Sequence, residues 1–200
     1  MNAQTSVPDP RPQLAGAGEQ LAKLIDSVRK EDLDRPTPCA EYDVRGLLAH
    51  VVDGMHRFAE LGESGSEQTP QPDPDPEGGW TAAYAEARTR LAAAWADDGR
   101  LAVPMTVPWG TMPGGVVLCG TVMEQVTHTW DLARALGTGT GELDQDLAGF
   151  ALGTAQQAVQ PERRGEGVPF GPVREAPEGA DTYGKLAAWL GRDPEWTAAR

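Results

Sequence analysis

The sequence contains few cysteines and few histidines, and it lacks any long apolar run. Its 200 residues include two cysteines and three histidines. Two cysteines are too few for a disulfide framework, so we expect free thiols in a reducing compartment. No apolar stretch approaches the roughly 20 residues that a membrane-spanning helix needs, and the N-terminus lacks the basic start and apolar core of a secretory signal. We therefore expect a cytoplasmic protein with no membrane partner.

Basic residues are also scarce. The chain has 17 lysines and arginines against 30 aspartates and glutamates, for a formal net charge of −13. Because the basic residues are not gathered in one segment, a phosphate backbone would be repelled. The composition therefore excludes nucleic acid as an expected partner and leaves a small-molecule substrate. A chain of this length forms one domain by default, and we expect a monomer or a homodimer.

Apolar residues recur at helical spacing in several segments. Asp43 is a suitable N-cap for one of them, and Pro36 and Pro38 separate that helix from the one before it. The four long helices that we predict cover residues 13–29, 43–61, 80–96 and 116–136, and two shorter ones cover 144–159 and 181–190. This pattern predicts a mainly α fold built on a four-helix bundle.

The segments between these helices are polar or rich in glycine and proline. We expect residues 1–12 to be disordered and residues 13–195 to form a single domain. Residues 62–79 have too few apolar side chains to offset the entropy of ordering, so we expect a flexible loop there. Residues 103–107 alternate like a short strand and are followed by turns as far as Gly115, which predicts a small β or irregular segment.

The most informative feature is a carboxylate and an imidazole four residues apart in one predicted helix. This spacing places Glu124 and His128 one turn apart on one face, close enough to bind a single cation. The alternative is a weak ion pair on an exposed face, and spacing alone favours that alternative.

A third metal ligand would have to come from another helix, and His50 is the obvious donor. Gly46 and Gly54 lie one turn before and after it, and each glycine inside a helix costs about 1 kcal/mol relative to alanine. These glycines suggest that something needs space beside His50. The alternative is that they serve helix packing and that His50 is hydrogen-bonded at a helix interface. His56 lies on a different side of the same helix.

Two imidazoles and one carboxylate suit zinc, with nickel or ferrous iron as alternatives, and they leave coordination positions free. Asp131 lies two turns from Glu124 on the same face, so it is our candidate catalytic group, able to orient a ligand or to receive a proton. Asp53 and Arg57 follow His50 and could bind substrate, with Arg57 suited to a carboxylate. Surface salt bridging is the alternative for Asp53 and Arg57.

Several short motifs together resemble a known family. The chain is similar to the DinB-like metal-binding proteins allied to the N-terminal domain of mycothiol-dependent maleylpyruvate isomerase, and the similarity extends from about Leu14 to Pro194. The motifs that carry it are Thr37-Pro38-Cys39, Leu47-Leu48-Ala49-His50, Pro108-Trp109-Gly110, Glu124 with His128 before Trp130-Asp131, and Gly191-Arg192-Asp193-Pro194.

The resemblance implies a DinB-like four-helix bundle with His50, Glu124 and His128 as metal ligands. It also implies a low-molecular-weight thiol such as mycothiol as a cofactor. Our leading hypothesis is a divalent-metal-dependent thiol transferase or isomerase that acts on a small electrophilic substrate. The alternatives are a metal-assisted hydrolase and a noncatalytic metal- or ligand-binding protein.

Overall fold

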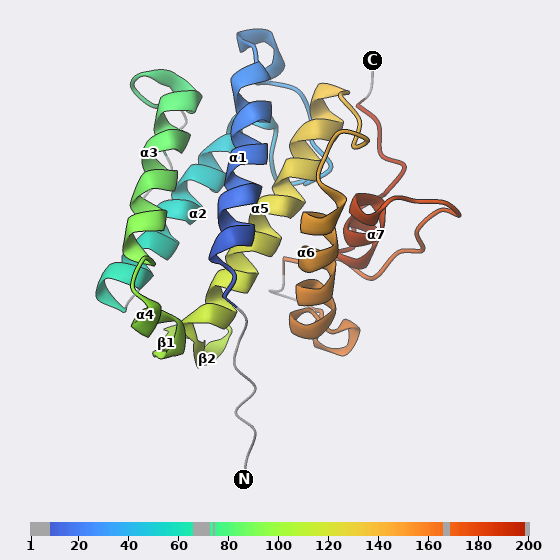
Figure 1. Cartoon of the computed structure of the whole chain (residues 1–200). Helices are drawn as coiled ribbons and strands as arrows, with labels where there is room; N and C mark the ends of the chain where they lie inside the picture. Colours follow the sequence, from blue (N-terminus) through green and yellow to red (C-terminus); the bar gives the residue numbers. More distant parts are fainter. Residues whose placement is uncertain (1–8, 66–72, 74, 166–168, 199–200) are drawn as a thin grey trace.

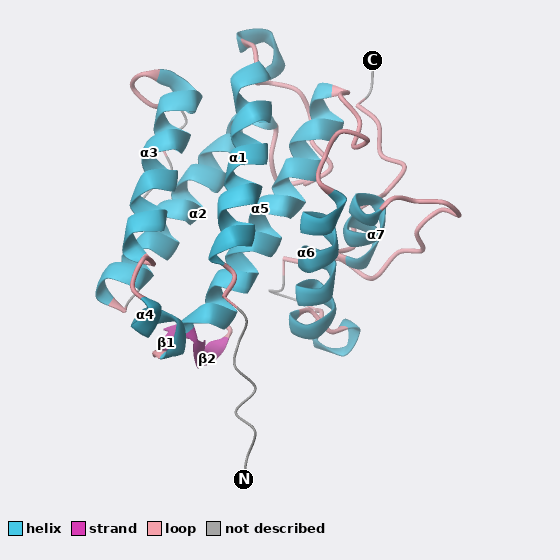
Figure 2. Cartoon of the chain, in the orientation of Figure 1, coloured by secondary structure: helices cyan, strands magenta, loops and turns pink. Residues whose placement is uncertain are grey.

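The computed structural model describes residues 9–65, 73, 75–165 and 169–198, and these residues are mainly α-helical (Figure 1; Figure 2). The helices are α1 (Arg11–Ser27), α2 (Val44–Ser64), α3 (Gly79–Ala94), α4 (Asp98–Ala102), α5 (Gly114–Leu136), α6 (Gln145–Ala158) and α7 (Thr182–Trp189). Two short 3-10 segments, η1 (Lys30–Asp32) and η2 (Pro161–Arg163), and the strands β1 (Pro104–Val107) and β2 (Gly110–Pro113) complete the described elements.

The four long helices form the predicted bundle. Helix α1 contacts α3 and α5, and α2 contacts the same two helices from the other side, so the four helices close a ring. Helices α6 and α7 pack on α5 outside this ring (Figure 1). Helix α5 is therefore covered on most sides, and 17 of its 23 residues are buried. This position matters for the site, because polar side chains on α5 lie inside the protein.

The ends of α2 and α5 follow the expected local chemistry. The Asp43 carboxylate caps α2 by accepting a hydrogen bond of 2.8 Å from the Gly46 amide. Gly65 follows the last residue of α2 and Gly137 follows the last residue of α5, with φ angles of 77° and 74° that disfavour any residue with a side chain. The N-cap prediction for Asp43 is confirmed, and α2 runs three residues beyond the predicted end at residue 61.

Three boundaries differ from the sequence prediction. Helix α1 already begins at Arg11, so residues 11 and 12 are helical rather than disordered. At the predicted flexible loop, Gly62 to Ser64 continue α2 and Gly79 opens α3. Residues 1–8, and residues 66–72 and 74 within the predicted loop, lie outside the described residues.

The predicted strand at residues 103–107 is one arm of a hairpin. Strand β1 pairs antiparallel with β2, with Met105 opposite Met112, and the hydroxyls of Thr106 and Thr111 lie 3.0 Å apart across the pair. At β2 the sequence predicts only turns, and the structure has a strand there. Residues with little intrinsic preference for a β-strand can still form one when they pair with a neighbouring strand, which explains why β2 was not predicted.

Helices α2 and α3 approach closely where Gly62 faces Trp95. The Trp95 indole is fully buried, and its Nε1 donates a hydrogen bond of 2.9 Å to the carbonyl of Phe58. A Cβ atom on Gly62 would lie 2.7 Å from Trp95 Nε1, so only glycine fits this contact without a shift. Within the described ranges, none of the helices has the length and apolar character that a membrane span requires.

Candidate metal centre

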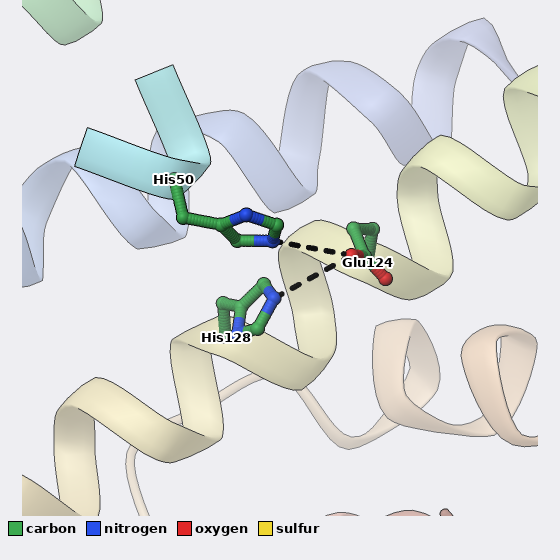
Figure 3. Close-up of side chains that lie close together, drawn as sticks. All are labelled: His50, Glu124 and His128. Atoms are coloured by element: carbon green, nitrogen blue, oxygen red, sulfur yellow. Dashed lines mark ion pairs between the residues drawn. The ribbon is translucent and has the colours of Figure 1, made fainter. Parts of the chain in front are cut away.

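Three potential metal ligands from two helices meet in the bundle. His50 projects from α2, and Glu124 and His128 project from α5 (Figure 3). The Nε2 atoms of His50 and His128 each lie 3.5 Å from the same oxygen, Glu124 Oε1. We call His50, Glu124 and His128 the triad. Its three ligand atoms all lie within 4.8 Å of one another.

The triad fits a small divalent cation. Nitrogen and oxygen ligands lie 2.0–2.1 Å from zinc in a tetrahedral site, which separates neighbouring ligand atoms by about 3.3 Å. Both imidazole–carboxylate distances in the triad are 3.5 Å, close to that value. Two imidazoles and one carboxylate also match the three protein ligands that catalytic zinc sites use. Among the described residues, this group contains no fourth histidine, cysteine, aspartate or glutamate.

The second ring nitrogen of each histidine also has a partner. The Asp131 carboxylate accepts a hydrogen bond of 2.9 Å from Nδ1 of His128. The Tyr42 hydroxyl lies 3.4 Å from Nδ1 of His50, and the Tyr42 ring stacks on the His50 ring with centroids 4.9 Å apart. Partners of this kind orient metal-binding imidazoles. Both rings are therefore held with Nε2 toward Glu124.

Arg192, near the C-terminus, holds Asp131 in turn. Its Nε donates a hydrogen bond of 2.8 Å to Asp131 Oδ1, and its Nη2 donates one of 2.9 Å to Asp131 Oδ2. Asp131 is fully buried, and its two oxygens are occupied by Arg192 and His128. These contacts match the first of the two roles that we considered for Asp131, which is to orient a ligand, in this case His128. A role of Asp131 in catalysis stays a prediction.

The charges of this cluster shift the pKa values in a consistent way. Burial lowers the pKa of His128, but hydrogen bonds with Asp131 and Glu124 outweigh it and raise that pKa to about 9. Partial burial raises the pKa of Glu124, but the two histidines lower it well below its usual range. Burial likewise opposes ionisation of Asp131, while Arg192 and His128 lower the pKa of its carboxyl group. In the metal-free protein a proton on His128 thus sits between two carboxylates.

One side of the triad is open to solvent. The side chains of Glu124 and His50 are 39% and 23% exposed, whereas that of His128 is 5% exposed. The burial of His128 distinguishes this arrangement from an ion pair on a fully exposed face. A small molecule can therefore approach the triad from the side of Glu124 and His50.

The other predicted residues of α2 lie in different surroundings. Asp53 is buried and lies 3.1 Å from Nε of Arg57. It lines a cavity of about 470 Å³ between α2 and α3, together with His56, and no triad residue lines that cavity. The structure therefore does not bring Asp53 to the triad. His56 contacts α3, with its Nδ1 3.4 Å from Nη1 of Arg90.

The charge of Arg57 acts on Tyr42, the residue that stacks on His50. Burial raises the pKa of the Tyr42 hydroxyl that faces His50, and the charge of Arg57 works against this rise. Arg57 is 31% exposed at its side chain. Its Nε is the atom that lies near Asp53.

Comparison with known proteins identifies the family of the chain. Residues 14–133 match the family described as Mycothiol maleylpyruvate isomerase N-terminal domain. The chain belongs to this family. It is also similar to two uncharacterized proteins of Mycobacterium tuberculosis, from strains CDC 1551 and H37Rv, each 34% identical over 176 residues. Each alignment covers 88% of this chain and 93% of the relative. No solved structure matches the chain.

Reasoning from spacing missed two residues that contact the candidate site. Tyr42 lies in the loop before α2, and nothing in its spacing indicates a contact with His50. Arg192 is 61 residues from Asp131 in the sequence, and it also lies beyond the matched residues 14–133. Its motif with Gly191 contributed to the resemblance, which was the only signal that could have pointed to it.

Proposed function

We propose that this protein is a divalent-metal-dependent enzyme that binds zinc and uses a low-molecular-weight thiol of the mycothiol type. The reaction would be a transferase or isomerase reaction on a small electrophilic substrate. The observation that carries the proposal is the triad, with two imidazoles aimed at one carboxylate and an open side. Family membership supports the choice of a thiol.

Each residue has a defined task in this proposal. His50, Glu124 and His128 would hold the cation. A bound cation of this kind lowers the pKa of a thiol or water beside it and so supplies a nucleophile at neutral pH. Asp131 keeps His128 in place and Tyr42 does the same for His50. Arg57 would bind an anionic group of the substrate or of the thiol, because a guanidinium pairs well with a carboxylate.

Cobalt substitution tests the proposal directly. We expect the purified protein to bind one Co²⁺ per triad, with a visible spectrum that His56→Ala leaves unchanged. Adding mycothiol should then produce a sulfur-to-cobalt charge-transfer band. A cobalt spectrum that does not respond to mycothiol would overturn the thiol chemistry and favour hydrolysis or metal binding alone. A protein that binds neither Co²⁺ nor Zn²⁺ would overturn the metal site itself.

A further inference from the structure

The segment that follows α7 returns to α5, where Arg192 contacts Asp131 and the carbonyl of Trp196 contacts Arg134. Arg192 in this segment has a side chain that is only 10% exposed, and it contacts the fully buried Asp131. Its two hydrogen bonds reach both Asp131 oxygens. The Asp131 oxygen that accepts from Nη2 of Arg192 also accepts from Nδ1 of His128. A continuous chain of contacts therefore joins Arg192 to a triad residue.

The direction of Arg192 is set by the way α7 ends. Gly191 has a φ of 85°, and a Cβ atom on it would lie 2.6 Å from the backbone of Gly171. The Arg192 amide donates a hydrogen bond of 2.9 Å to the carbonyl of Ala187, and Nε of Arg174 donates one of 3.0 Å to the carbonyl of Gly191. A side chain at residue 191 would be strained and would clash. The turn is therefore built so that Arg192 points back toward α5.

We propose that Arg192 is a positioning residue that sets the affinity of the triad for a divalent cation, so that cation binding and docking of residues 191–194 are coupled. The inference rests on the proposed metal site. A guanidinium fork that binds both oxygens fixes the plane of a carboxylate, and the carboxylate fixes the ring of His128. Because coupling between two sites is reciprocal, a cation bound at the triad must also stabilise the docked segment.

The decisive measurement is the dissociation constant of Zn²⁺ for variants of the full chain. Arg192→Met should weaken Zn²⁺ binding roughly tenfold. This is the lower end of the loss of metal affinity that follows mutation of groups hydrogen-bonded to metal ligands. Arg134→Met is the matched control. Arg134 also holds the C-terminal segment, since its Nε donates a hydrogen bond of 2.9 Å to the carbonyl of Trp196, but no hydrogen bond or ion pair joins it to Asp131. It should change the constant by less than about twofold.

A double-mutant cycle separates positioning from general destabilisation. Arg192→Met leaves the Asp131 carboxylate buried without its cationic partner, which can unfold a protein. Asp131→Asn combined with Arg192→Met removes both charges and should fold. If Arg192 acts through Asp131, adding Arg192→Met to Asp131→Asn should weaken Zn²⁺ binding by less than about twofold more. An effect as large as in the wild-type background would overturn the proposal.

Hydrogen exchange of backbone amides tests the coupling separately, because an arginine that only stabilises the fold would not make these exchange rates depend on Zn²⁺. Zn²⁺ should slow exchange of the Gly191 and Arg192 amides in the wild-type protein and in Arg134→Met, but not in Asp131→Asn. If the wild-type protein binds no Zn²⁺, the proposed function fails and this inference fails with it. If it binds Zn²⁺ but Arg192→Met and Arg134→Met behave alike, or if these amides do not respond, only this inference fails.

Discussion

Metal binding by the triad should depend steeply on pH between 7 and 9. In the metal-free protein, Asp131 and Glu124 raise the pKa of His128 to about 9, and His128 must lose its proton before Nε2 can bind a cation. Below pH 9 each unit of pH therefore changes the apparent affinity about tenfold. Since half of the His128 side chains still carry the proton at pH 9, the gain from pH 7 to pH 9 is about 50-fold, or about 2.3 kcal/mol. Glu124 adds nothing to this slope, because its lowered pKa keeps it ionised throughout.

The assay is competition with a chelator whose own affinity for Co²⁺ is known at each pH. His56→Ala should keep the full slope, since His56 contacts Arg90 of α3 instead of the triad. Asp131→Asn should move the steep range to lower pH, because it removes one of the two carboxylates that raise the pKa of His128. An affinity that stays constant from pH 7 to pH 9 in the wild-type protein would refute the reasoning, since His128 would then carry no proton for the cation to displace.

The remaining predictions concern the triad, the metal-free protein and the packing of α2. Alanine at any triad position should weaken metal binding by more than the roughly 10- to 100-fold typical of outer partners, with helical circular dichroism retained, and metal analysis against His56→Ala checks this. The metal-free protein should lose stability as pH rises. The raised pKa of His128 contributes stability that is fully present below the unfolded pKa of about 6.5 and is lost as pH rises through about 9. A thermal midpoint that stays constant over this range would contradict this prediction. Gly62→Ala should destabilise the protein by roughly 1–3 kcal/mol, since the added Cβ would lie 2.7 Å from Trp95 Nε1. Gly54→Ala, on the same helix and with no atom within 4 Å of its added Cβ, should instead stabilise it by up to about 1 kcal/mol, and denaturant unfolding compares the two.

Much of the fold could be predicted from local patterns. Apolar spacing located all four bundle helices to within a few residues, and Asp43 indicated the start of α2 because its carboxylate can cap a free amide. Of the two strands of the hairpin, the sequence predicts only β1, because the residues of β2 have little preference for a strand and depend on pairing with β1. The pairing of Glu124 with His128 also followed from local geometry, because a spacing of four residues on a helix fixes their proximity.

The sequence by itself determined which side chains of one helix share a face, and the tertiary structure decided what that face contacts. Helical projection put Glu124 and His128 on a face that could equally have been exposed. Helix α5 is enclosed by α1, α2, α6 and α7, so His128 is buried, Glu124 stays partly exposed, and the pair becomes part of a candidate metal site with His50. The contacts of Tyr42 with His50 and of Arg192 with Asp131 were likewise settled only by folding. Contacts between residues far apart in sequence depend on how helices pack and how loops return, which local spacing does not record.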